Sequence, residues 1–171
     1  MSVESTVYSP RPAISLSQLI DAARGADIEL RAFDGHDDSS LRPAADAGAL
    51  LYDSWYVMVG WPRRHAETTQ AVDEAIGRRD KPAIDRLAVE GKFGWCDLSC
   101  TRFDYEKSWE RFPEERDEVE ESYSPDELER LRRAETKYFL RCGTRPAQNG
   151  DLLCKVAELI ASATDGFLDE P

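Results

Sequence analysis

The stretch from Ala49 to Trp61, ALLYDSWYVMVGW, is the longest apolar run of the chain, and Asp53 is its only charged residue. At helical spacing its apolar side chains occupy most of the circumference, which is typical of a buried helix. A strand of this length would be about twice the usual five or six residues. Pro62 would end a helix here. We therefore expect a central buried helix, while the composition of residues 55–59 leaves a strand as the alternative.

Weaker periodic patterns surround this run. A capping box at Ser124, with Pro125 and Glu127 in the following positions, is the clearest local signal and starts a helix that we expect to reach Arg141. The other expected helices cover residues 15–24, 66–78, 80–91 and 151–163, and extended segments cover 28–33 and 92–105. This pattern predicts a mainly helical α+β fold, with about six helices around the central apolar helix and a small two- or three-stranded β element.

The domain organisation expected from these patterns is simple. Residues 1–13 are polar and contain Pro10 and Pro12, so we expect a flexible N-terminal tail. Residues 14–171 are sufficient for one globular domain with its own core. Within this domain, residues 110–129 form a distinct acidic segment.

The charge of the chain restricts its partners. The sequence has 34 acidic and 22 basic residues, a net charge of −12. Such a surface repels nucleic-acid phosphates and anionic membranes, and it suits a basic partner. The apolar run is shorter than the ~20 residues of a membrane-spanning helix. The first residues do not resemble a secretory signal, so we expect a cytoplasmic protein with reduced thiols.

Residues 110–129 contain ten acidic and two basic residues, a net charge of −8. Val119 is the only apolar residue between Pro113 and Ser122, so this part has no face to bury as a helix. We expect an exposed helix, a mobile loop or a segment that a partner orders. The predicted partner-binding residues are Glu110, Glu114, Glu115, Asp117, Glu118, Glu120, Glu121 and Asp126. A second candidate is an aromatic surface around Trp61, Trp95 and Trp109.

The residues that bind metals or act as nucleophiles do not form a familiar motif. Zinc sites usually pair cysteines at a spacing of about two to four residues; three residues separate Cys96 from Cys100, but eleven separate Cys142 from Cys154. The segment His36-Asp37-Asp38 lacks the regular spacing of a calcium loop. A phosphate-binding glycine motif, HExxH and GxSxG are also missing. We therefore predict no metal, no cofactor and no catalytic residues.

These observations favour a non-catalytic interaction protein, such as an inhibitor, immunity protein, adaptor or assembly factor. It would bind the basic patch of another protein through the acidic helical segment, without direct contact to nucleic acid or membrane. Two alternatives remain open. One is a nucleic-acid mimic that blocks a DNA-binding protein. The other is a small enzyme that uses His36 or His65 together with nearby carboxylates.

Overall fold

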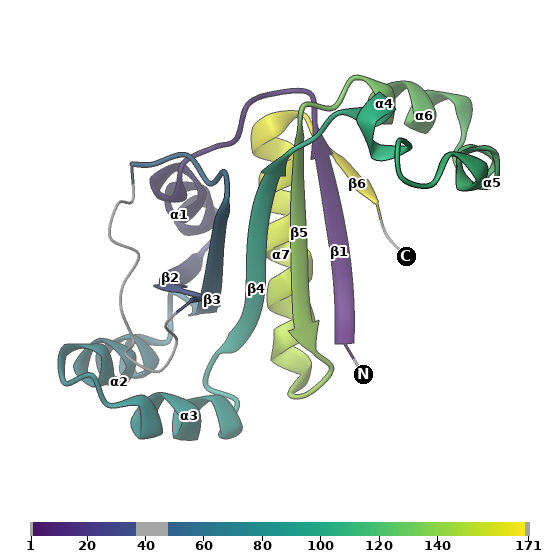
Figure 1. The fold of residues 1–171 in the computed structure, drawn as a ribbon. Helices are drawn as coiled ribbons and strands as arrows, with labels where there is room; N and C mark the ends of the chain where they lie inside the picture. The colour runs from purple at the N-terminus through teal and green to yellow at the C-terminus, as the bar shows by residue number, and fades with distance from the viewer. Residues whose placement is uncertain (1, 37–47, 170–171) are drawn as a thin grey trace.

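One antiparallel sheet of six strands organises the computed structural model, which describes residues 2–36 and 48–169 (Figure 1). The strands are β1 (Ser2–Ser9), β2 (Ile28–Asp34), β3 (Ser54–Pro62), β4 (Gly94–Arg102), β5 (Thr136–Gly143) and β6 (Phe167–Asp169). Their order across the sheet is β2-β3-β4-β5-β1-β6. The first strand therefore lies between the two strands that come last in the sequence.

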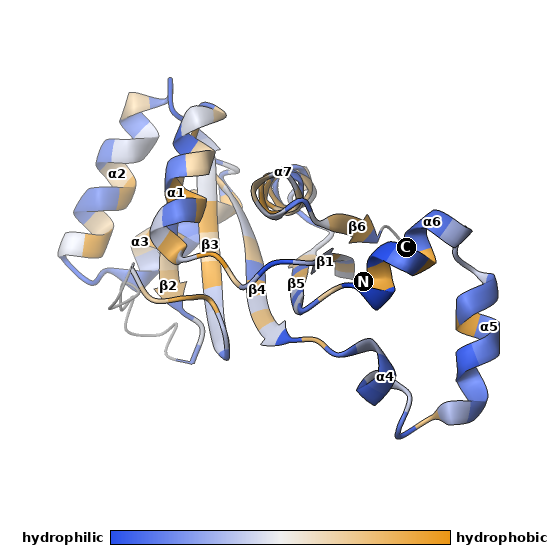
Figure 2. Ribbon diagram, turned by 90° about the horizontal axis from the view of Figure 1, so that it is seen from above, coloured by the Kyte–Doolittle hydropathy of each residue, from blue (hydrophilic) through white to orange (hydrophobic). Residues whose placement is uncertain are grey.

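Helices cover both faces of the sheet unequally. The helices are α1 (Leu16–Gly25), α2 (Ala66–Gly77), α3 (Lys81–Val89), α4 (Tyr105–Ser108), α5 (Arg116–Glu121), α6 (Pro125–Arg132) and α7 (Ala147–Thr164), and η2 (Pro113–Glu115) is a single 3-10 turn. Helices α1 and α7 pack on one face and enclose the main core. Helices α2 and α3 pack on the opposite face near β2 and β3, and α4 to α6 project from the other end of the sheet (Figures 1 and 2).

The expected central helix is wrong, because the second half of the apolar run is strand β3. Met58 points into the core under α1 and α7, whereas Val59 and Trp61 point into the core under α2 and α3. A strand that is buried on both faces has no polar side to alternate with its apolar one. Its sequence is therefore apolar throughout, like that of a buried helix. Residues 51–53 form the bend and turn that precede the strand.

The predicted fold class is also wrong, since a six-stranded sheet replaces the small β element and the central helix. The segments expected to be extended do form β2 and β4. The helix that starts at the Ser124 capping box ends at Arg132 instead of Arg141. From Thr136 onward, side chains alternate between the core and the opposite face of the sheet, so tertiary pairing with β1 and β4 favours strand β5.

Residues 1–13 are not a flexible tail in this structure, because residues 2–9 form β1 and pair with β5 along their whole length. Val7 is fully buried, and the core side of the strand also contains Ser5 and Ser9. The Ser9 hydroxyl donates a hydrogen bond to the carbonyl of Arg11 at 3.1 Å, which satisfies the buried group. Because Ser5 and Ser9 occupy inward positions, the sequence does not show the alternation of apolar and polar residues that would indicate a strand.

The four other predicted helices form where the sequence indicated, as α1, α2, α3 and α7. Ser15 caps α1 in a reciprocal capping box with Gln18, and the Asp80 side chain accepts the Ala83 N–H at the start of α3. The core under α1 and α7 includes the fully buried side chains of Leu98 and Tyr138. Among the described residues, no helix combines the length and apolar character needed to cross a membrane.

Candidate functional site

Residues 103–135 leave the sheet between β4 and β5 and return to it, forming a structure that we call the acidic arm (Figure 1, upper right). Two backbone hydrogen bonds close its base. The Phe103 N–H donates to the Glu135 carbonyl at 2.9 Å, and the Glu135 N–H donates to the Ser9 carbonyl at 2.8 Å. The arm is therefore a closed excursion whose ends are fixed to the sheet, rather than a loose loop.

A small cluster on β6 supports the last third of the arm. The Tyr123 hydroxyl donates to Asp169 at 2.8 Å, and Arg130 donates to the Gly166 carbonyl at 2.9 Å. The Arg130 guanidinium also lies over the Phe167 ring, 5.6 Å from its centre. Burial and the neighbouring Asp169 carboxylate both raise the pKa of Tyr123, so this phenol stays protonated and remains a donor.

Charged groups brace the middle of the arm. Arg116 Nε lies 2.8 Å from Glu120, and the same guanidinium reaches Glu106 at 3.0 Å. Arg132 approaches Glu120 from α6 at 3.3 Å, and the Tyr105 hydroxyl donates to the same carboxylate. One acidic side chain thus joins α4, α5 and α6.

This network changes the acidity of Glu120. Hydrogen bonds from Tyr105 first, and from Arg116 second, lower the pKa of Glu120 from its ordinary 4.5 to about 2. The pKa values of these two partners rise. The Glu120 carboxylate raises the pKa of Arg116, and burial followed by Glu120 raises the pKa of Tyr105. Glu120 is therefore ionised at neutral pH and engaged within the arm.

Seven of the eight predicted partner-binding carboxylates have a different environment. They are Glu110, Glu114, Glu115, Asp117, Glu118, Glu121 and Asp126. Each is exposed, and none forms an ion pair or side-chain hydrogen bond with another residue in the part of the chain that the structure describes. Glu120 is the exception, because its carboxylate forms ion pairs with Arg116 and Arg132 inside the arm. The arm therefore presents uncompensated negative charge on an ordered support, and Figure 2 shows its helices coloured mostly as hydrophilic.

The structure does not gather the predicted aromatic residues into one surface. Trp61 is only 2 % exposed and donates a hydrogen bond to Thr69 at 2.9 Å, so it belongs to the core under α2 and α3. Trp95 is half-buried on β4, and Trp109 is half-buried on the arm, where its ring meets Tyr105 edge-on. The sequence reasoning missed Phe112, which is 46 % exposed beside the unpaired carboxylates. The available signal in the sequence was an aromatic residue next to a run of charged ones.

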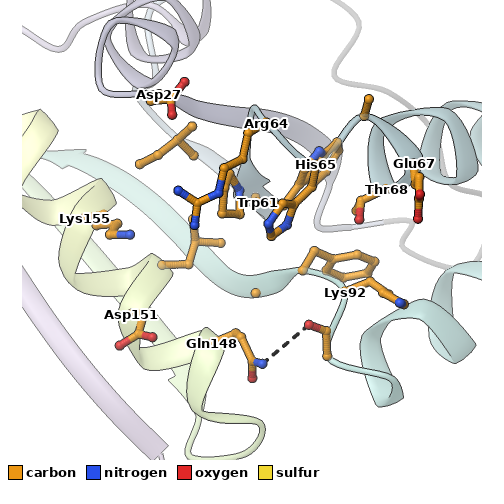
Figure 3. A pocket seen from close by; sticks show the side chains of 18 of the residues that line it. Asp27, Trp61, Arg64, His65, Glu67, Thr68, Lys92, Gln148, Asp151 and Lys155 are labelled. Carbon is orange, nitrogen blue, oxygen red and sulfur yellow. Dashed lines mark hydrogen bonds between the residues drawn. The ribbon is translucent and has the colours of Figure 1, made fainter.

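A cavity of about 840 Å³ lies away from the arm, where β3 ends and β4 begins (Figure 3). Its basic lining residues are Arg64, His65, Lys92 and Lys155. Its acidic lining residues are Asp27, Glu67, Glu90 and Asp151. Gly94 lets α7 approach β4 closely here, since a Cβ at this position would lie 2.2 Å from the Gln148 carbonyl oxygen. The sequence identified His65 as a candidate residue. It could not predict that His65 and the other lining residues, which come from different elements, lie around one cavity.

The cysteines and histidines of the chain do not form one cluster among the described residues. Cys96, Cys100 and Cys142 are buried on the core side of β4 and β5, while Cys154 is exposed on α7. Among the described residues, no group of three or more histidine, cysteine or carboxylate side chains is arranged to hold a metal ion. His36 packs edge-on against Trp55, and the Asp37 and Asp38 that follow it lie outside the described residues.

Comparisons of the chain with protein-family models, with curated proteins and with solved structures found no match.

Proposed function

We propose that this protein is a non-catalytic interaction protein, of the inhibitor, immunity, adaptor or assembly-factor kind, whose acidic arm binds a basic surface of another protein. The observation that carries the proposal is the set of seven exposed carboxylates without an ion pair in the described structure. Crowded like charges repel one another and oppose a compact fold. A basic partner would relieve this repulsion and would be attracted over a distance before contact.

The internal bracing of the arm supports this role. Glu120, Arg116 and Arg132 hold the helices to one another, so the unpaired carboxylates occupy defined positions before a partner arrives. Such preorganisation reduces the entropy that binding must overcome. Phe112 adds an exposed aromatic ring beside the charges, and aromatic residues are frequent energetic centres of protein interfaces.

A charge-reversal experiment tests the proposal. The test variant changes Glu114, Glu115, Glu118 and Glu121 to lysine. The matched control changes four exposed carboxylates outside the arm that likewise form no ion pair with a described residue, and so has the same net charge: Glu67, Glu90, Asp151 and Glu158. Both proteins and the wild type serve as bait in affinity capture from the native host, followed by mass spectrometry.

We expect the wild type and the control to retain one basic partner that the arm variant loses, while circular dichroism shows all three proteins folded. Capture should also weaken steeply with added salt, because charges at an exposed contact are screened over about 8 Å at physiological ionic strength. A partner retained equally by the arm variant would refute the role of the arm. Displacement of the partner by DNA would instead identify the protein as a nucleic-acid mimic.

A further inference from the structure

Two buried cysteines lie opposite each other on neighbouring strands of the sheet. The register of β4 and β5 pairs Asp97 with Arg141, and one residue further along it places Cys96 opposite Cys142. Both side chains belong to the core under α1 and α7, where Cys96 is 0 % and Cys142 is 1 % exposed. The two thiols therefore lie on the same side of the sheet and next to one another across adjacent strands.

The hydrogen-bond pattern of the two strands brings these side chains close together. The Phe103 N–H donates to the Glu135 carbonyl, so these two residues are a hydrogen-bonded pair. Hydrogen-bonded and non-hydrogen-bonded pairs alternate along an antiparallel ladder, and counting along the register makes Cys96 and Cys142 a non-hydrogen-bonded pair. The Cα atoms of such pairs are about 4.5 Å apart, which is near the lower end of the ~4.4–6.8 Å that a disulfide spans.

A buried amide side chain separates the strands slightly just beyond the cysteine pair. The Asn149 side chain accepts the Trp95 N–H at 3.1 Å and donates to the Gly143 carbonyl at 3.5 Å, and so bridges β4 and β5 where their ladder ends. An amide between two strands holds them further apart than a direct hydrogen bond does. The added width moves the Cα–Cα distance of the cysteine pair toward the ~5.5–6 Å that is most frequent in disulfides. The fold therefore provides the spacing that a disulfide needs.

The other two cysteines have different surroundings. Cys100 is buried on the same side of β4, but the residue opposite it on β5 is Tyr138. Cys154 is exposed on α7, and it lies near Cys142, because burial first and Cys154 second raise the pKa of the Cys142 thiol. Burial first and Cys142 second likewise raise the pKa of the Cys96 thiol. Cys142 thus has two thiol neighbours, and Cys96 is the one that shares its buried face of the sheet.

We propose that Cys96 and Cys142 form a reversible dithiol–disulfide pair that small disulfides of the glutathione type oxidise. Both S–H bonds break and one bond forms between the two Sγ atoms, while two electrons and two protons pass to the small disulfide, which is released as two thiols. The new bond closes a loop over residues 97–141, which contains the whole acidic arm. It ties β4 to β5 at the strand ends away from the arm (Figure 1), and so resists separation of the two strands that carry it.

Refolding of the full chain in a glutathione buffer tests this pair, because both thiols are covered in the folded protein and accessible until the sheet has formed. The reduced protein is unfolded in guanidinium chloride and diluted into reduced and oxidised glutathione, and the remaining thiols are then blocked with N-ethylmaleimide. Peptide mass spectrometry identifies each disulfide, and calorimetry gives the melting temperatures of the oxidised and reduced forms. The variants are Cys96→Ala and Cys142→Ala. Cys100→Ala, which removes another buried thiol of β4, is the matched control.

We expect Cys96–Cys142 to be the main protein disulfide of the refolded wild type and of Cys100→Ala, and dithiothreitol should reverse it. Oxidation without refolding, in guanidinium chloride, should instead favour Cys96–Cys100, because the shorter loop costs less entropy to close. The disulfide should raise the melting temperature of the wild type and of Cys100→Ala by about 5–10 °C, since it restricts the unfolded chain. Cys96→Ala and Cys142→Ala should not show this rise.

A refolded wild type whose main disulfide is Cys142–Cys154 would overturn the proposal, because the pairing would then not follow the strand register. The absence of a protein disulfide would overturn it too, as would an oxidised form that melts no higher than the reduced one. The wild-type disulfide map decides the question even if an alanine variant does not fold. The result is independent of the charges of the acidic arm, so it leaves the proposed interaction with a basic partner untouched.

Discussion

Arg116 and Glu120 form a 2.8 Å ion pair one turn apart on α5, a helix of the acidic arm in which no residue is buried. Through it, Arg132 of α6 and Tyr105 of α4 share a single carboxylate. Most of the other acidic residues nearby have no such role. The arm therefore combines one structural carboxylate with many that are free to meet a partner.

Acidification should loosen the arm. The pKa of Glu120 falls from its ordinary 4.5 to about 2 in the folded arm. A lowered folded-state pKa means that its stabilising effect is complete above a pH of about 4.5 and is lost as the pH falls from there toward about 2. Amide NMR signals of α5 should report this loss. Glu120→Gln should already show the loosened arm at neutral pH, whereas Glu121→Gln, at an exposed and unpaired neighbour, should behave like the wild type. Identical pH profiles in all three proteins would contradict the role of Glu120.

Two tryptophans of β3 should differ sharply in their contribution to stability. Trp61 is 2 % exposed, so Trp61→Ala should lower the free energy of unfolding by about 3–5 kcal/mol. Trp55 is 39 % exposed, and Trp55→Ala should lower it by only about 1 kcal/mol. Chemical denaturation measures both values. Equal losses would mean that Trp55 is buried as deeply as Trp61.

The hydroxyl of Tyr138 should also be essential to the main core. It accepts the Ile14 N–H at 3.0 Å, and the side chain is fully buried. Tyr138→Phe leaves that N–H without an acceptor and should destabilise the fold by about 1–3 kcal/mol. Tyr56→Phe is the matched control, because the Tyr56 hydroxyl forms no hydrogen bond with a described residue. Calorimetry should show a lower melting temperature for the first variant alone.

The four cysteines should react in two classes. Cys154 is exposed, whereas Cys96, Cys100 and Cys142 are buried. Burial raises the pKa of Cys100 to about 12 and also raises that of Cys96, so these thiols are protonated as well as covered. An aromatic disulfide reagent should modify one thiol in the folded protein and all four in denaturant. Cys154→Ser should remove the fast reaction, and its persistence would show that a buried thiol is accessible.

Sequence reasoning placed several elements correctly because their signals are local. The capping box at Ser124 and the cap at Asp80 depend on residues within one turn, and both are present. The strand β3 was harder, since its apolar character results from layers on both faces, and those layers come from distant parts of the chain. Strand β5 was not predicted from the sequence, for a related reason. Its pairing with β1 and β4 overrides the helical pattern that precedes it.

The candidate sites also combine features that local sequence predicts with contacts that only the fold creates. Composition alone identified the acidic segment. The spacing of four residues from Arg116 distinguishes Glu120 from Glu121 locally, but only the fold brings Arg132 and Tyr105 to the Glu120 carboxylate. The cavity where β3 ends and β4 begins could not be predicted from the sequence, because its lining residues lie as far apart in the chain as Asp27 and Lys155. The neighbouring Arg63 and Arg64 look equivalent in the sequence. In the fold, Arg63 lies beside Glu29, whereas Arg64 lines the cavity.

The place of β1 between β5 and β6 has a consequence for biosynthesis. The ribosome makes β1 before the other five strands of the sheet, but both sheet neighbours of β1, β5 and β6, are made after β2, β3 and β4. During translation β2, β3 and β4 can already pair with one another, while β1 must wait with its backbone donors and acceptors exposed. Such long-range closure is slow, and an unpaired strand is prone to aggregation. Chaperone capture of nascent β1 would therefore be most valuable until residue 143 has emerged.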